Sequence, residues 1–279
     1  MRISRTILAL TLAASAAGTV SAQTFGGYGV QLNGTGGGGT PVVTSGGVLQ
    51  LINDAYGATT SAFTTSAFAF DPSQMWSTSF NLHYAFTSAD IASGFHQGGD
   101  GIAFVLQNGG ADAIGAGGGE MAYQGMAGNS IAVGFRSFWD DVLFGQDGAF
   151  GSTPLVPSSA DLLISETGST SDFIIPVMLS YDGAGTLSLS YTGNDGVTVF
   201  TGSTAVDLSS LGPDVRLGFT GASGAATQLA EVSDWRVTGL KATESSTSTP
   251  EPASLALTAT GLAGVVGVAR RRKARVSSI

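Results

Sequence analysis

Alternation of apolar and polar residues over short segments constrains the fold of this sequence more than any other feature. In residues 77–84 (STSFNLHY), Phe80, Leu82 and Tyr84 alternate with polar residues, which is the period of a strand that buries one face. Turn signals such as DGAG and NDG separate segments of this kind. The predicted strands are residues 48–52, 61–70, 76–86, 101–106, 130–138, 173–181, 186–191, 197–201, 215–220 and 231–240. About ten strands predict an all-β fold, a single sandwich of antiparallel sheets.

The composition indicates what stabilises this sandwich. The 279 residues are enough to bury a substantial core, and they include 42 glycines and no cysteine. Core packing, rather than disulfide bonds, must therefore hold the fold together. Residues 26–47 contain NGTGGGGT and are predicted to form a flexible surface loop. This stretch matches the spacing of a dinucleotide-binding motif, but no strand precedes it and no helix follows it, which argues against that function.

Residues 1–22 have the pattern of a secretory signal peptide. Arg2 and Arg5 precede an apolar stretch at residues 7–17, and small residues at 20–22 form a cleavage pattern. An N-terminal membrane anchor is the alternative, although the apolar stretch is short for a membrane span. The sequence therefore predicts export through the inner membrane.

The C-terminal end combines three features in a fixed order. Pro-Glu-Pro at 250–252 is followed by a mostly apolar stretch at 253–269 and by basic residues at 270–275. By its length and flanking charges, the apolar stretch is a short transmembrane helix with its basic end in the cytoplasm. Residues 250–279 also resemble the PEP-CTERM sorting signal of Gram-negative bacteria that make exopolysaccharide. That resemblance implies only transient membrane contact, cleavage by an exosortase, and a final location at the cell surface or outside the cell. An ordinary tail anchor is the alternative.

The Ser/Thr-rich residues 241–249 are predicted to be a linker to the tail.

Charge limits the partners of the mature chain. Between residues 23 and 252 there are 20 acidic residues and four basic ones, which gives a net charge of −16. The basic residues are Arg136, Arg216, Arg236 and Lys241. Because such a surface repels phosphate groups, nucleic acid is not expected as a partner.

Three segments in the middle of the chain contain the candidate binding residues. They are GGDGIAFVLQN at 98–108, IGAGGGEMAYQG at 114–125 and NSIAVGFRSFWDD at 129–141. An aspartate between glycines beside an apolar strand can accept hydrogen bonds from vicinal sugar hydroxyls, and a glycine loop lets backbone amides approach a ligand. Taken alone, the first segment is also typical of a turn, and the second of a flexible connection.

Together and in this order, the three segments resemble the legume-type (L-type) lectins and their bacterial relatives. The resemblance extends to residues 61–84 and 215–237, so the lectin-like domain is predicted to span residues 23–240. It implies a concanavalin A-like jelly roll that binds a polysaccharide or another glycan. It also implies that Asp100 binds the sugar, that the amide of Gly118 or Gly119 donates to it, and that Asp140 contacts both calcium and sugar.

Two residues depart from the pattern that this resemblance implies. Gly134 stands where the family has a glutamate ligand of a transition metal, and Arg136 stands where it has an aspartate that bridges the two metals. Calcium needs six to eight oxygen ligands, several of them anionic. The paired metal site is therefore predicted to be absent, and a calcium ion would have only Asp140 and Asp147 as acidic ligands, with the carbonyl of Phe138.

Arg136 itself needs an explanation, because a guanidinium on a buried strand is costly unless it is paired. We hypothesise that Arg136 occupies the space of the metals and bridges Asp140 with Asp141 or Asp147, and also Asp100. The alternative is that Arg136 points into solvent.

Enzymatic activity is not expected. Glycoside hydrolases of the same jelly-roll type need two carboxylates that face each other across a cleft. The glutamates at 120, 166, 231, 244 and 251 show no such pairing along a strand. The sequence thus predicts an exported, non-enzymatic lectin-like protein. The alternatives are a structural matrix protein that has lost sugar binding, and a glycoside hydrolase.

Overall fold

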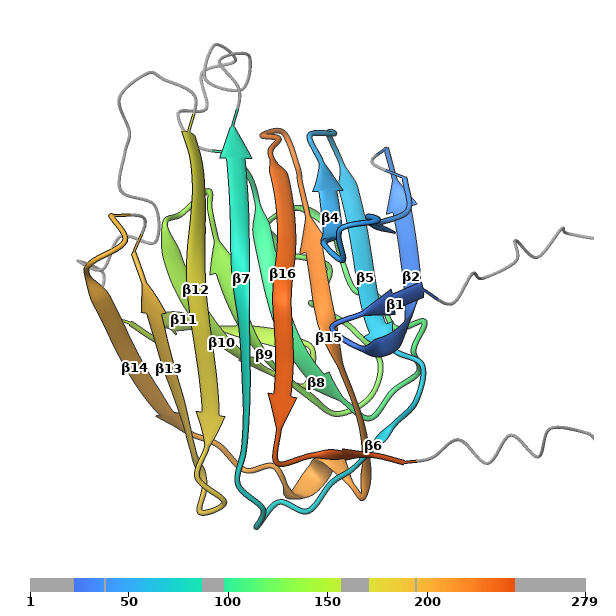
Figure 1. Cartoon of the computed structure of the whole chain (residues 1–279), viewed down its shortest axis with the longest axis vertical. Coiled ribbons are helices and arrows are strands. Elements are labelled where there is room, and N and C mark those ends of the chain that lie inside the picture. The colour runs from blue at the N-terminus through green and yellow to red at the C-terminus, as the bar shows by residue number, and fades with distance from the viewer. Residues whose placement is uncertain (1–22, 38, 87–97, 157–170, 194, 244–279) are drawn as a thin grey trace, which may run out of the picture. The chain divides into compact units, whose positions relative to one another are not determined.

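Two antiparallel β-sheets lie face to face in the computed structural model, which describes residues 23–37, 39–86, 98–156, 171–193 and 195–243 (Figure 1). The seven-stranded sheet, in front in Figure 1, has the order β14 (Val199–Ala205), β13 (Thr186–Thr192), β12 (Ser171–Tyr181), β7 (Trp76–Phe86), β16 (Leu229–Thr238), β4 (Leu49–Asn53) and β3 (Val42–Val43).

The ten-stranded sheet lies behind it. Its main path is β1 (Gln23–Phe25), β2 (Tyr28–Gly36), β5 (Ala58–Thr64), β15 (Asp214–Ala222), β8 (Gly101–Gln107), β9 (Ser130–Arg136), β10 (Asp141–Gln146) and β11 (Ala149–Pro154), and β6 (Phe68–Ala69) pairs with both β15 and β17 (Lys241–Ala242). The predicted all-β antiparallel sandwich is therefore confirmed.

Strict alternation in the sequence gives the most regular strand. β7 has the predicted bounds, and its residues alternate between buried and partly exposed along its whole length. Phe80, Leu82 and Tyr84 face the space between the sheets, where Phe80 packs against Phe104 and Phe219 with ring centroids 5.9 and 5.0 Å away. These rings are part of one large apolar core between the two sheets, which supplies most of the hydrophobic stabilisation.

The prediction of a flexible loop at residues 26–47 is wrong for most of its first half. β2 pairs with β5 from Val30 opposite Thr64 to Gly36 opposite Ala58. Cross-strand pairing thus overrides the weak strand preference of glycine. β10 and β11 were likewise not predicted, and β17 forms in residues that had been assigned to the linker.

A long connection between β8 and β9 covers the outer face of the ten-stranded sheet. Tyr123 and Met126 from this connection form a second, smaller core with Phe63, Val105 and Ala132. β8 is consequently buried at all seven of its residues, on both faces of the sheet. The same connection contains the 3₁₀ helix η1 (Gly118–Glu120), and the small core holds it close to the end of β15.

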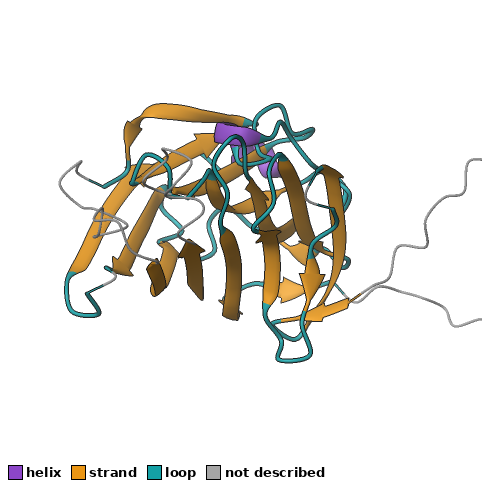
Figure 2. Ribbon diagram, turned by 90° about the horizontal axis from the view of Figure 1, so that it is seen from above, coloured by secondary structure: helices purple, strands orange, loops and turns teal. Residues whose placement is uncertain are grey.

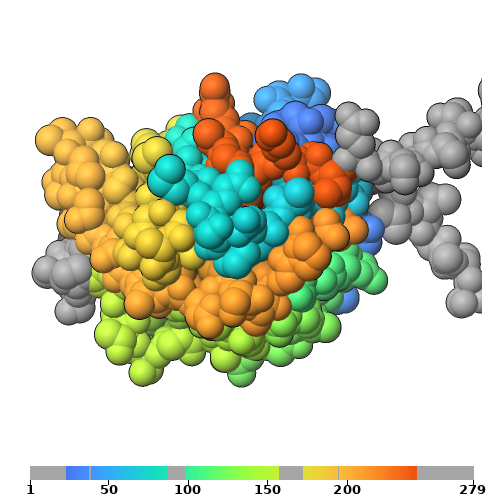
Figure 3. Space-filling model, turned by 90° about the horizontal axis from the view of Figure 1, so that it is seen from below, coloured from blue at the N-terminus to red at the C-terminus, as the bar shows by residue number. Residues whose placement is uncertain are grey.

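The end of the sandwich opposite to Asp100 is closed by turns. Figure 3 shows this end, where cyan, yellow and orange segments lie close together. The Tyr181 hydroxyl donates to the Pro72 carbonyl (2.8 Å), which ties the end of β12 to the turn before β7.

The predicted signal peptide at 1–22, the linker after residue 243 and the sorting signal at 250–279 lie outside the described residues. Within the described part of the chain, no helix has the length and apolar character needed to cross a membrane.

Candidate functional site

Asp100 lies where β8 begins and where β9 and β15 end. Its backbone N–H donates to the Ala222 carbonyl (2.8 Å), and its carbonyl accepts a long hydrogen bond from the Phe138 N–H (3.5 Å). The Gly99–Asp100 peptide bond is cis. Figure 2 looks down on this end of the sandwich, where loops join the strands. Segments near residues 100, 138 and 222 therefore converge at this end of the sandwich.

The carboxyl group of Asp100 is buried and incompletely hydrogen-bonded. The residue is 7% exposed, and its Oδ2 has no hydrogen-bond partner among the described residues. Burial raises the pKa of Asp100 to about 6, although a backbone hydrogen bond from Gly224 acts in the opposite direction. Buried polar atoms are mostly paired in folded proteins, so this carboxylate oxygen can accept a hydrogen bond from a ligand or from water; six other buried side-chain atoms of the described residues are unpaired as well, but none of them is charged.

Two glycines surround this oxygen. Gly224 follows β15, and a Cβ atom at this position would lie 3.0 Å from Oδ2 of Asp100. Gly118 has a φ of +64°, and a Cβ atom there would lie 3.8 Å from the same oxygen. The absence of side chains at both positions leaves room beside the carboxylate and exposes backbone groups next to it. The structure thus brings Asp100 and Gly118 together, as predicted, and adds Gly224.

Trp139 forms the outer wall of the site. It lies in the turn between β9 and β10 and is 47% exposed. A Cβ atom at Gly119 would lie 2.6 Å from Cη2 of Trp139, so glycine is required for the indole to lie against η1. Trp139 was not among the predicted site residues. A large aromatic ring in a turn, beside an arginine and two aspartates, was the signal that could have identified it.

Arg136 is paired, not solvated. Its Nε donates to Oδ1 of Asp141 (2.6 Å) and its Nη2 donates to Oδ2, so the contact is bidentate. Only 19% of the Arg136 side chain and 16% of the Asp141 side chain are exposed. The guanidinium carbon also lies 4.6 Å from the centroid of the Trp139 ring, within the range of a cation–π contact. Arg136 therefore contacts both the strand after the turn and the exposed residue within it.

Asp140 and Asp147 do not lie at the same end of β10. Asp140 ends the turn beside Trp139, with a φ of +54°. Asp147 follows the other end of the strand, where its Oδ1 accepts a hydrogen bond from the Ser130 N–H (3.1 Å). Six strand residues separate the two aspartates, a span of about 20 Å. The predictions that Asp147 supplies a calcium ligand beside Asp140 and that it pairs with Arg136 are therefore wrong, because the length of β10 separates Asp147 from both residues.

The described residues do not fit the paired metal site that the resemblance implies. A Cβ atom at Gly134 would lie 2.5 Å from Cε of Met121 and 2.8 Å from Cε1 of Phe150, so apolar groups fill the space into which a ligand at position 134 would project. Arg136 places a positive charge at the second position. Among the described residues, no group of three or more His, Asp or Glu side chains is arranged to hold a metal ion.

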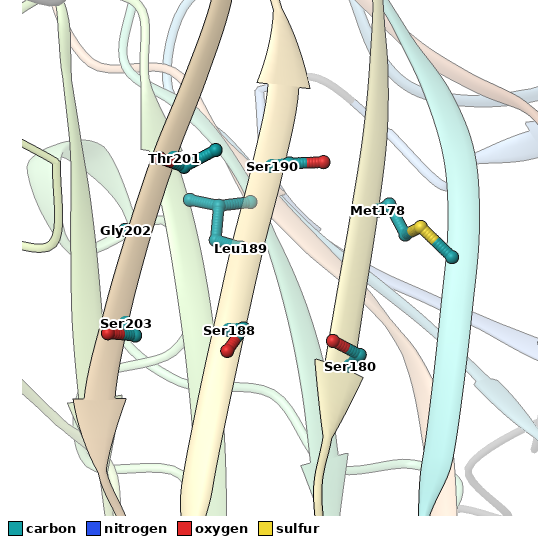
Figure 4. A pocket seen from close by; sticks show the side chains of 8 residues that line it. All are labelled: Met178, Ser180, Ser188, Leu189, Ser190, Thr201, Gly202 and Ser203. Carbon is teal, nitrogen blue, oxygen red and sulfur yellow. The ribbon is translucent and has the colours of Figure 1, made fainter.

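A hollow lies on the outer face of the seven-stranded sheet, lined by residues far from Asp100 in the sequence. Figure 4 shows its lining, in which hydroxyl groups of neighbouring strands stand in two rows beside Met178. The lining residues are Met178, Ser180, Ser188, Leu189, Ser190, Thr201, Gly202 and Ser203. None of them is charged or aromatic, and this hollow offers less chemistry for ligand recognition than the Asp100 site.

Comparisons with known proteins bear on the fold. No protein-family model matches the chain, and no curated protein matches its sequence. Among solved structures, the basic lectin of winged bean, crystallised with Tn-antigen, superposes with a TM-score of 0.58 at 20% identity, covering 75% of this chain and 91% of that one. The fold is that of the legume lectins.

Two further structures have the legume-lectin fold and cover most of this chain. Peanut lectin, solved with a nine-residue peptide, has a TM-score of 0.54 at 21% identity, and the match covers 83% of this chain and 97% of that one. Arcelin-5, a lectin-like defence protein of Phaseolus vulgaris, has a TM-score of 0.54 at 16% identity, covering 77% and 93%. The resemblance inferred from the sequence is thus confirmed at the level of the fold.

Proposed function

We propose that the chain is a carbohydrate-binding protein whose ligand lies between Asp100, Gly118, Gly224 and Trp139. The observation that carries this proposal is the unpartnered Oδ2 of Asp100, which lies between two glycines and near an exposed tryptophan. The glutamates of the sequence show no pairing along a strand of the kind that glycoside hydrolases need, which supports a non-enzymatic function.

Each group matches one part of a sugar ring. The Asp100 carboxylate accepts hydrogen bonds from vicinal hydroxyls, which are charge-assisted and hence strong. Backbone groups of Gly118 and Gly224 lie close enough to the carboxylate to contact the same hydroxyls. The indole of Trp139 offers a flat apolar surface for the C–H face of a pyranose. The net charge of −16 between residues 23 and 252 favours a neutral or basic glycan over an acidic one.

Export and sorting are part of the same proposal. The signal-peptide pattern at 1–22 and the PEP-CTERM-like pattern at 250–279 support transport through the inner membrane, transient membrane contact through residues 253–269, and cleavage by an exosortase. The mature protein would then meet polysaccharide at the cell surface or in the extracellular matrix. The departures at Gly134 and Arg136 favour a second candidate function, a structural matrix protein that keeps the fold without binding sugar.

A glycan array probed with the purified full chain tests these alternatives. We expect binding to a defined set of glycans, lost in Asp100→Asn and weakened at least tenfold in Trp139→Ala. Asp112→Asn removes an exposed carboxylate in the connection that carries η1, and it serves as the matched control that leaves binding unchanged. Absence of binding to any glycan would support the structural function. Release of new reducing ends from a polysaccharide would identify a hydrolase.

A further inference from the structure

Arg136 lies beside Trp139, directly before the turn that carries this tryptophan. On one side its backbone pairs with Gly101, the residue after Asp100, and on the other side it pairs with Asp141. The four-residue turn 137–140 connects Arg136 to Asp141 directly. Any interaction that fixes the Arg136 side chain therefore fixes the base of this turn relative to Asp100.

The ion pair has the properties needed for that task. It is bidentate and mostly buried, and a guanidinium fork holds a carboxylate in one orientation more strictly than an ammonium group does. The guanidinium carbon lies 4.6 Å from the centroid of the Trp139 ring, and the far edge of the indole lies beside Gly119 of η1, while 47% of the residue stays exposed. The turn thus has a charged base and an aromatic ring packed over it.

Metal ions have no place in this arrangement. Met121 and Phe150 occupy the space beside Gly134, and the guanidinium supplies the positive charge next to Asp141. A divalent cation bound here would have to displace these groups and would meet electrostatic repulsion from Arg136.

We infer that the Arg136–Asp141 ion pair, with Trp139 stacked on it, organises the glycan site in place of metal ions, so that ligand binding requires no divalent cation. This inference rests on the proposed carbohydrate-binding function for its ligand. Arg136 acts in it as a positioning residue, because it holds Trp139 and the turn and does not contact the sugar.

Chelation tests the first half of the inference on the purified full chain. Treatment with EDTA, followed by addition of Ca²⁺ or Mn²⁺, is expected to change the melting temperature by less than about 1 °C and glycan affinity by less than twofold. Elemental analysis is expected to find less than about 0.1 equivalent of bound metal. A melting temperature that falls with EDTA and recovers with Ca²⁺ or Mn²⁺ would overturn the inference.

Substitution tests the second half. Arg136→Ala and Asp141→Asn are each expected to lower the melting temperature by about 5–10 °C, because each leaves a buried charge unpaired. At 15 °C, where the variants are folded, both are expected to lose at least tenfold in glycan affinity. Acrylamide quenching of Trp139, which is already 47% exposed in the wild-type chain, is expected to rise further. Trp76 and Trp235 are buried, so a rise in quenching reports on Trp139.

Matched variants separate positioning from folding. Arg236→Ala removes an exposed arginine of β16 and is expected to change neither affinity nor quenching. Arg136→Lys keeps the charge without the bidentate contact, and it provides a folded variant if Arg136→Ala does not fold. Affinity and quenching equal to those of the wild-type chain in both Arg136→Lys and Asp141→Asn would overturn the inference. If the wild-type chain binds no glycan at all, the proposed function fails, whereas the chelation, metal-content and quenching measurements still decide the role of Arg136.

Discussion

Replacing the Asp100 carboxylate by an amide is expected to stabilise the protein at neutral pH while it abolishes ligand binding. The pKa of Asp100 rises from 3.8 to about 6 because of burial. This difference corresponds to up to about 3 kcal/mol of destabilisation when the group is ionised. Asp100→Asn removes the charge and keeps the shape, although its new N–H groups need partners. We therefore expect a net gain of about 1–2 kcal/mol in the free energy of unfolding near pH 7.5.

The sign of the pH dependence provides an independent check. Between pH 3.8 and about 6 the folded state binds the Asp100 proton more tightly than the unfolded state does, so the stability of the wild-type chain falls as the pH rises through this range. The advantage of Asp100→Asn should consequently be present near pH 7.5 and nearly absent near pH 4. Other titrating groups are common to both chains and cancel in the difference.

Urea unfolding, followed by tryptophan fluorescence at both pH values, measures this difference. Asp112→Asn removes an exposed carboxylate and controls for the general effect of lower negative charge. A loss of stability in Asp100→Asn near pH 7.5 would refute the reasoning, since the carboxylate would then make a stabilising interaction in the folded protein.

Two further predictions concern other parts of the sandwich. The His83 ring lies between Glu231 and Asp172, with a nitrogen 2.8 Å from an oxygen of each. Burial alone would lower the pKa of His83, but the hydrogen bonds and negative charges of the two acids outweigh burial, so the pKa is raised. The stability that protonated His83 adds should be complete below pH 6.5 and lost as the pH rises through the folded-state pKa. In urea unfolding, the loss of unfolding free energy in His83→Gln should therefore be larger at pH 5.5 than at pH 8.5. An equal loss at both pH values would contradict this prediction. Gly134→Glu should destabilise the chain by about 3 kcal/mol or more, because the new side chain meets Met121 and Phe150, and Ca²⁺ should not restore the lost stability in a thermal melt.

The strands predicted best from the sequence are those in which buried and exposed residues alternate. β7 alternates along all of its residues and was found with its observed bounds. β2 and β10 do not alternate in this way: β2 is partly exposed on both faces, and β10 begins with an aspartate whose partner is a neighbouring strand. Their assignment depends on pairing with β5 and β9, and a local pattern contains no information about such partners.

The site was predicted in part for a related reason. Asp100 and Gly118 were named as candidates because their residue types occur in a recognisable order. The structure places them together, and their role in binding stays a prediction. The choice among Asp140, Asp141 and Asp147 as partners of Arg136 depended on where the chain turns. Because the turn ends at Asp140, Asp141 is directly opposite Arg136, while Asp147 lies at the far end of β10.

The two carboxylates near Arg136 have different tasks, and their environments explain the division. Asp141 forms one hydrogen bond with the guanidinium through each of its carboxylate oxygens, and only 16% of its side chain is exposed, so the protein itself occupies this group more than it occupies Oδ2 of Asp100. Asp100 has a raised pKa with burial as the main cause, and its Oδ2 keeps its capacity to accept a hydrogen bond. Had Arg136 paired with Asp100 instead, the pKa of Asp100 would be lowered and the carboxylate would be occupied by the protein itself. An arginine directed toward Asp141 therefore holds the base of the turn and leaves Oδ2 of Asp100 without a protein partner, which is the arrangement that the proposed metal-free site requires.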